Sequence, residues 1–109
     1  MTCEPWEVVA VPFPFTDRPV AKRRPALVLS KRTFQRGGYT VLAMITSSAH
    51  SSWPGDTRLT DYQGAGLRVP CIVRLKLFTL DNRLLLRKIG QLAPVDQRRA
   101  RQNLRKYLV

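Results

Sequence analysis

The stretch that decides the fold is Lys22-Arg23-Arg24-Pro25-Ala26-Leu27-Val28-Leu29-Ser30. It joins three consecutive cations to a short apolar run, and such a run between Pro25 and Ser30 predicts a strand that is buried on both faces. Proline has no backbone N–H, so we expect Pro25 at the first position of this strand. Arg24 then lies where a basic loop enters the core and faces outward, a suitable position for holding a phosphate. On these residues alone, a charged loop beside a core strand is the simpler interpretation.

Other short β-rich runs lie on both sides of this stretch. We expect strands over residues 6–11, 39–46, 67–80 and 83–92, and a short edge strand at 57–59. Residues 12–15 contain two prolines and predict an extended arm that presents Phe13 and Phe15. These rings can pack over the end of a barrel, the more common outcome, or stack on bases. The polar residues 31–38 end in a Gly-Gly turn signal.

The only convincing helical pattern begins at Pro94 and runs to about residue 108. One face of this helix is apolar and the other is strongly basic. The apolar face consists of Ala100, Leu104, Tyr107 and Leu108. Many short strands, frequent turns and one terminal helix predict a mainly β fold in a single domain over residues 1–109. We expect a small, strongly curved sheet or closed barrel with a C-terminal α-helix.

The charge of the chain points to a polyanionic partner. There are 19 lysines and arginines against 7 aspartates and glutamates, a formal net charge of +12 at pH 7. Such an imbalance costs self-repulsion in a compact chain, and it predicts nucleic acid, an anionic membrane or an acidic protein segment as the partner. No signal-peptide pattern or membrane-length apolar run is present, and Cys3 and Cys71 lie far apart. We therefore expect a cytoplasmic protein with reduced thiols.

The side chains available for catalysis are arginine, lysine and hydroxyl groups. The single histidine, His50, is interpreted as a loop residue without a catalytic role, and the scattered acids predict neither a metal site nor a cofactor. Such a set can still cleave RNA, because the substrate's own 2′-OH is the nucleophile. A planar guanidinium can neutralise the charge of the phosphorane-like transition state, although it is a poor general base. This chemistry would be specific for RNA, since DNA lacks the 2′-OH.

Four blocks of the sequence resemble the PemK/MazF family of toxin ribonucleases from bacterial type II toxin–antitoxin pairs. They are residues 6–17, residues 22–30 with the Arg24-Pro25 step, residues 43–47 with Ile45-Thr46-Ser47, and residues 66–81 from Gly66-Leu67-Arg68 through Val73-Arg74 to Asp81. The resemblance implies an SH3-like closed barrel of the CcdB/MazF/PemK type that forms a homodimer. It implies sequence-selective, metal-independent cleavage of single-stranded mRNA, with 2′,3′-cyclic phosphate and 5′-OH products. An acidic cognate antitoxin is the expected protein partner, and DNA is expected to be contacted only through the antitoxin complex.

The resemblance also implies the site residues. Arg24 and Thr46 fall on the catalytic positions of the family, and Arg74 on a residue that holds a neighbouring phosphate. Further contacts with RNA are expected from Lys22, Arg23, Ser47 and Phe15. Two departures leave the general base unidentified: Pro19-Val20-Ala21-Lys22 replaces a Gly-Ser/His-Glu-Gln motif, and Lys76 stands where some members have an acid.

Two other functions remain open from the sequence. A gyrase-directed toxin of the same barrel is one, although proteins like CcdB act through a terminal Trp-Gly-Ile and this chain ends in Tyr107-Leu108-Val109. A non-catalytic basic module that binds RNA or DNA is the other, with charge supplying affinity and aromatic rings stacking on bases. It would bind RNA without shortening it.

Overall fold

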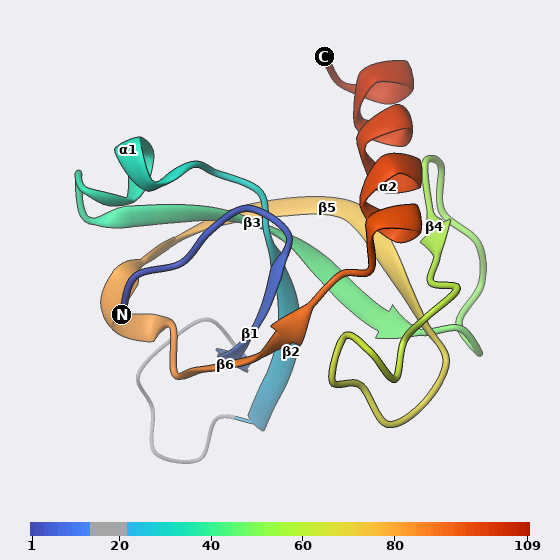
Figure 1. Cartoon of the computed structure of the whole chain (residues 1–109), viewed down its shortest axis with the longest axis horizontal. Helices are drawn as coiled ribbons and strands as arrows, with labels where there is room; N and C mark the ends of the chain where they lie inside the picture. The colour runs from blue at the N-terminus through green and yellow to red at the C-terminus, as the bar shows by residue number, and fades with distance from the viewer. Residues whose placement is uncertain (14–21) are drawn as a thin grey trace.

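The computed structural model describes residues 1–13 and 22–109. Its elements in chain order are β1 (Glu7–Phe13), β2 (Lys22–Val28), α1 (Arg32–Gln35), β3 (Tyr39–Ser47), β4 (Thr57–Arg58), β5 (Cys71–Asp81), the 3-10 helix η1 (Asn82–Leu84), β6 (Arg87–Gln91) and α2 (Pro94–Tyr107). The strands form one antiparallel sheet in the order β4-β5-β3-β2-β1-β6. Figure 1 shows this sheet curled into a half-barrel, with α2 beside β4. The expected mainly β fold with a C-terminal helix is confirmed.

The core consists of two apolar clusters on opposite faces of the curled sheet. The strands supply both, because successive side chains point to opposite faces. The first cluster includes Leu27 of β2 and Ala100 of α2, together with Leu59, Ala65 and Leu67, so α2 and the segment after β4 cover that face. The second cluster is formed by Cys3, Val9, Val11, Ala26, Val28, Leu42, Leu80 and Leu85. The expected burial of residues 26–29 on both faces is confirmed for Ala26, Leu27 and Val28, whereas Leu29 follows the end of β2 and is half-buried.

The two halves of β2 have different neighbours. β1 pairs with β2 along its whole length, whereas β3 pairs only with Ala26, Leu27 and Val28. The strand begins at Lys22, so the prediction that Pro25 opens it was wrong. Pro25 is tolerated inside the strand because β2 has no hydrogen-bonded neighbour on the β3 side at that point.

β1 also extends further than the sequence predicted. Pro12 and Phe13 pair with Arg23 and Lys22 of β2, so the expected arm is part of the strand as far as Phe13. Pro12 needs a paired strand on one side only, because the ladder between β1 and β6 ends at Ala10. The remainder of the expected arm, including Phe15, lies outside the described residues.

The remaining differences concern the ends of elements. The segment expected as a polar loop contains the one-turn helix α1, and β5 and β6 begin later than predicted, at Cys71 and Arg87. The helix α2 follows its prediction, but Tyr107 and Leu108 are about half exposed because the helix projects beyond the sheet (Figure 1). Among the described helices, none is long and apolar enough to cross a membrane.

Candidate functional site

A pocket of about 350 Å³ opens where β2 and β3 diverge. The last pair of their ladder is Ala26 with Met44. If the same register continued for two more residues, Arg24 would lie opposite Thr46. The ladder stops instead at Pro25, which lacks an N–H. The side chains of Arg24 and Thr46 both line the pocket. The pocket therefore opens beside Pro25, at the point where β3 no longer pairs with β2.

Arg24 contributes a guanidinium to the lining of this pocket. The residue is exposed, and the carbon at the centre of its guanidinium lies 5.7 Å from the centroid of the Phe13 ring. This cation–π contact holds the side chain over the pocket without occupying its hydrogen-bond donors. Among the described carboxylates, none forms an ion pair with Arg24. No carboxylate in the described part of the chain therefore competes with an incoming anion for these donors.

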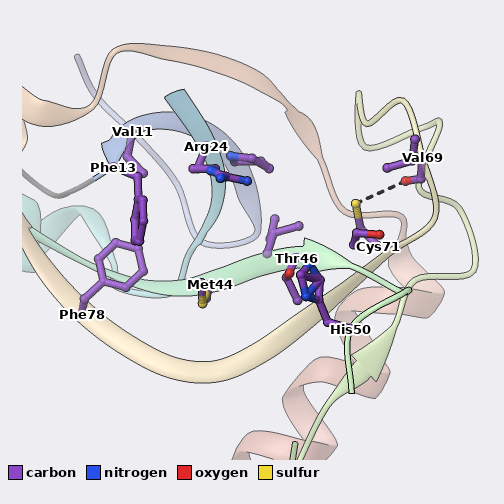
Figure 2. Close-up of a pocket in the computed structure, with 12 residues that line it drawn as sticks. Val11, Phe13, Arg24, Met44, Thr46, His50, Val69, Cys71 and Phe78 are labelled. Carbon is purple, nitrogen blue, oxygen red and sulfur yellow. Dashed lines mark hydrogen bonds between the residues drawn. The ribbon is translucent and has the colours of Figure 1, made fainter. Parts of the chain in front are cut away.

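The two ends of the pocket differ in chemistry, as Figure 2 shows. Phe13 and Phe78 lie together at one end, with Met44 toward the middle. Thr46 and His50 lie toward the other end, with Arg24 on the wall between the two ends. An aromatic surface next to a cation and hydroxyls suits a ligand that carries both a flat ring and a phosphate.

Ser47 is the last residue of β3, and His50 lies in the turn that follows the strand directly. The carbonyl of Ser47 accepts the N–H of His50 at 3.2 Å, and the Oγ of Ser47 accepts the N–H of Ala49 at 3.2 Å. The N–H of Ser48 donates to the carbonyl of Pro70 at 3.0 Å. These bonds bend the chain back after Ser47, so that His50 lines the pocket together with Ser47 although it lies beyond the end of the strand.

Arg74 occupies a different place from the other site residues. Its Nε and Nη2 donate to Asp56 Oδ1 and Oδ2 at 3.1 and 2.9 Å, and Nη2 also donates to the carbonyl of Ser51. The side chains of Arg74 and Asp56 are only 11% and 15% exposed. These hydrogen bonds to Asp56 raise the pKa of the Arg74 guanidinium above its usual range. Arg74 does not line the pocket, so its contact with a phosphate stays a prediction.

Among the other residues expected to contact RNA, some line the pocket and others do not. Ser47 lines the pocket, whereas Lys22 and Arg23 are exposed on the same half of β2 as Arg24 but outside the lining. Phe15 lies outside the described residues. Of the site residues named from the sequence, Arg24, Thr46 and Ser47 therefore lie in one pocket.

Three parts of the pocket were not foreseen. Met44 and Phe78 were treated only as strand residues, and His50 as a loop residue, yet all three line the pocket. The alternation of β3 could have placed Met44 on the same face as Thr46. Phe78 and His50 depend on the pairing of β3 with β5 and on the turn after β3, which local patterns do not fix.

Cys71 is a further lining residue, with an inert thiol. It was expected to be a small core residue, and its side chain is buried. Burial raises the pKa of the thiol, and Sγ donates to the carbonyl of Val69 at 3.2 Å (dashed in Figure 2). The thiol is therefore protonated at neutral pH, the unreactive form of cysteine.

A small basic β-protein with an open, cationic pocket is the class that the fold and site define. The family of PemK-like, MazF-like toxins of type II toxin-antitoxin systems matches residues 4–108, and the chain belongs to this family. The resemblance seen in the sequence is confirmed. A comparison with curated proteins finds no match.

Solved structures of MazF toxins share the fold. The MazE-MazF complex from Deinococcus radiodurans superposes with a TM-score of 0.76 at 21% identity, covering 99% of this chain and 97% of that one. The Mycobacterium tuberculosis toxin MazF-mt6 gives a TM-score of 0.73 at 18% identity, with 92% and 93% covered. An endoribonuclease in complex with its cognate antitoxin from a mycobacterial species gives 0.74 at 14% identity, with 97% and 94% covered.

Proposed function

We propose that this toxin is a sequence-selective endoribonuclease that cleaves single-stranded mRNA without a metal ion. The observation that carries the proposal is that Arg24 and Thr46 line the same open pocket. RNA needs no nucleophile from the enzyme, because its 2′-OH can attack the adjacent phosphorus. The products would be a 2′,3′-cyclic phosphate and a 5′-OH.

Arg24 has the chemistry that this reaction needs most. The guanidinium would donate two hydrogen bonds to the scissile phosphate and offset the charge that develops in the transition state. Its donors have no carboxylate partner among the described residues, so no ion pair has to be broken there when the phosphate enters.

Thr46 and the aromatic end of the pocket would position the substrate. The hydroxyl of Thr46 would bind the same phosphate or orient the 2′-OH, with Ser47 beside it. A base next to the scissile phosphate would lie against Phe13 and Phe78, since every base has a face that stacks on aromatic rings. Lys22 and Arg23 would contact phosphates further along the strand.

The net charge of +12 supports the proposed partners. RNA is the polyanionic substrate, and an acidic antitoxin segment would compete for the same cationic surface. The solved complexes of similar fold with an antitoxin support this partner, and we propose a homodimer that acts in the cytoplasm. Any contact with DNA would be made through the antitoxin complex.

The test is cleavage of an end-labelled single-stranded RNA by the purified protein in EDTA. We expect cutting at defined sites, and a loss of about 10²–10³-fold or more in Arg24→Ala. Arg87→Ala is the matched control, because it removes one exposed cation from β6, outside the pocket. Undiminished cutting by Arg24→Ala would remove Arg24 from the mechanism, and loss of wild-type activity in EDTA would contradict the metal-free reaction. Binding of RNA without cutting would identify a non-catalytic module.

A further inference from the structure

Three titratable side chains among the described residues line the pocket. They are Arg24 from β2, Cys71 from β5 and His50 from the turn after β3. A guanidinium holds its proton too tightly to act as a base, and burial keeps the Cys71 thiol protonated. Imidazole is the side chain that changes charge between about pH 5 and 8, which suits a general base.

The carboxylates of the described residues, the usual alternative to histidine, are engaged elsewhere. Of the seven acids, only Asp17 lies outside the described residues. None of the other six lines the pocket. Asp56, Asp81, Glu4 and Glu7 pair with cations, and Asp61 and the fully buried Asp96 accept backbone N–H groups of residues 60–64. Within the described part of the chain, His50 is the remaining candidate.

The backbone on both sides of His50 is fixed. On one side its own N–H is bonded to Ser47, whose hydroxyl faces the same pocket. On the other side the carbonyl of Ser51 accepts a hydrogen bond from Arg74, which is itself held by Asp56. The imidazole of His50, an exposed residue, lies at the end of the pocket that contains Thr46 (Figure 2).

We propose that His50 is the general base of the cleavage reaction, an assignment that rests on the proposed ribonuclease function. The imidazole accepts the proton of the 2′-OH as the bond between O2′ and phosphorus forms. The bond between phosphorus and O5′ breaks, and the leaving oxygen takes a proton from water. His50 then releases its proton to solvent, so the cycle consumes no co-reactant.

The first test is the pH dependence of single-turnover cleavage by His50→Gln. We expect the rate to fall by about 10²-fold or more, and the wild-type rise in rate across the range where imidazoles titrate to disappear. The control is Ser52→Ala, an exposed residue near the same turn that does not line the pocket. Imidazole added to the buffer should raise the cleavage rate of His50→Ala but not that of Arg24→Ala. A purely structural role of His50 would not produce this rescue.

The second test separates a base from an acid. A substrate with sulfur in place of the 5′ bridging oxygen has a leaving group that needs no proton. If His50 is the base, His50→Gln stays equally impaired on this substrate. Recovery of the wild-type rate there would overturn the assignment, because His50 would then be the acid.

The outcomes distinguish this inference from the proposed function. Wild-type protein that leaves RNA intact would contradict the ribonuclease itself. Wild-type protein that cuts RNA, while His50→Gln cuts equally fast with the same pH profile, would overturn only the role of His50. Unchanged affinity of His50→Gln for an RNA with a 2′-deoxy scissile nucleotide would show that the pocket is intact.

Discussion

At the scale of single residues, the site lies beside one proline. Pro25 lies where β2 loses β3 as a neighbour, and Arg24 precedes it on the side where the pocket opens. Arg24 and Thr46 were named as site residues through the resemblance to the toxin family, since the local pattern marks them only as residues near the ends of apolar strands. The sequence could not predict that Arg74 meets Asp56, 18 residues earlier, since that contact depends on the tertiary fold. His50 was missed for the same reason.

The role of the Thr46 hydroxyl can be tested separately from the role of the side chain's volume. Thr46→Val keeps the volume and removes the hydroxyl, so we expect kcat to fall by roughly 10–10²-fold, since one positioned donor is worth about 10²–10³ at most. Thr46→Ser should keep most of the activity. The measurement is single-turnover cleavage at saturating protein. Equal rates for Thr46→Val and wild type would assign Thr46 to the wall of the pocket alone.

At the scale of elements, the turn after β3 is held by an ion pair with little exposure. Asp56 accepts two hydrogen bonds from Arg74 and one from the N–H of Trp53, at 2.9 Å. Trp53 in turn lies over Lys76, with 5.0 Å between the Lys76 Nζ and the ring centroid. This cluster ties the segment between β3 and β4 to β5. Breaking such a cluster lowers the free energy of unfolding more than breaking an exposed ion pair does.

Asp56→Asn should lower the free energy of unfolding by about 2–4 kcal/mol, because the Arg74 guanidinium loses its charged partner in a largely buried position. Glu4→Gln is the control: its pair with Arg32 is more than half exposed, and its loss should cost about 1 kcal/mol or less. Urea denaturation of both variants gives the comparison. Equal midpoints would mean that the ion pair does not stabilise the turn.

The elements themselves were predicted well where the pattern was local. The terminal helix and the strand over 39–46 came close to α2 and β3, because Pro94 and the β-rich run mark them clearly. The strand that corresponds to β2 was predicted to begin too far along the chain, because the charged residues 22–24 have the pattern of a loop. Their pairing with β1 overrides that preference, as it does for Pro12 and Phe13. Pairing between strands is a property of the sheet and leaves little trace in either segment alone.

At the scale of the whole molecule, the net charge of +12 should make binding of RNA strongly salt-dependent. For contacts with about four to six phosphates, a single strand gives a slope of roughly −3 to −4 in log K against log salt. Arg23→Ala should reduce that slope by about 0.7, by the loss of one phosphate contact. Fluorescence anisotropy with a non-cleavable oligonucleotide measures both slopes. A slope near zero would exclude phosphate contacts as the source of affinity.

The most direct test compares two RNA oligonucleotides that differ only at the scissile nucleotide, one with a 2′-OH and one with a 2′-deoxy sugar, both in EDTA. If the substrate supplies its own nucleophile beside Arg24, the first is cut to a 2′,3′-cyclic phosphate and a 5′-OH, and the second binds but stays intact at that position. Cleavage of the 2′-deoxy oligonucleotide at the same bond would contradict the account.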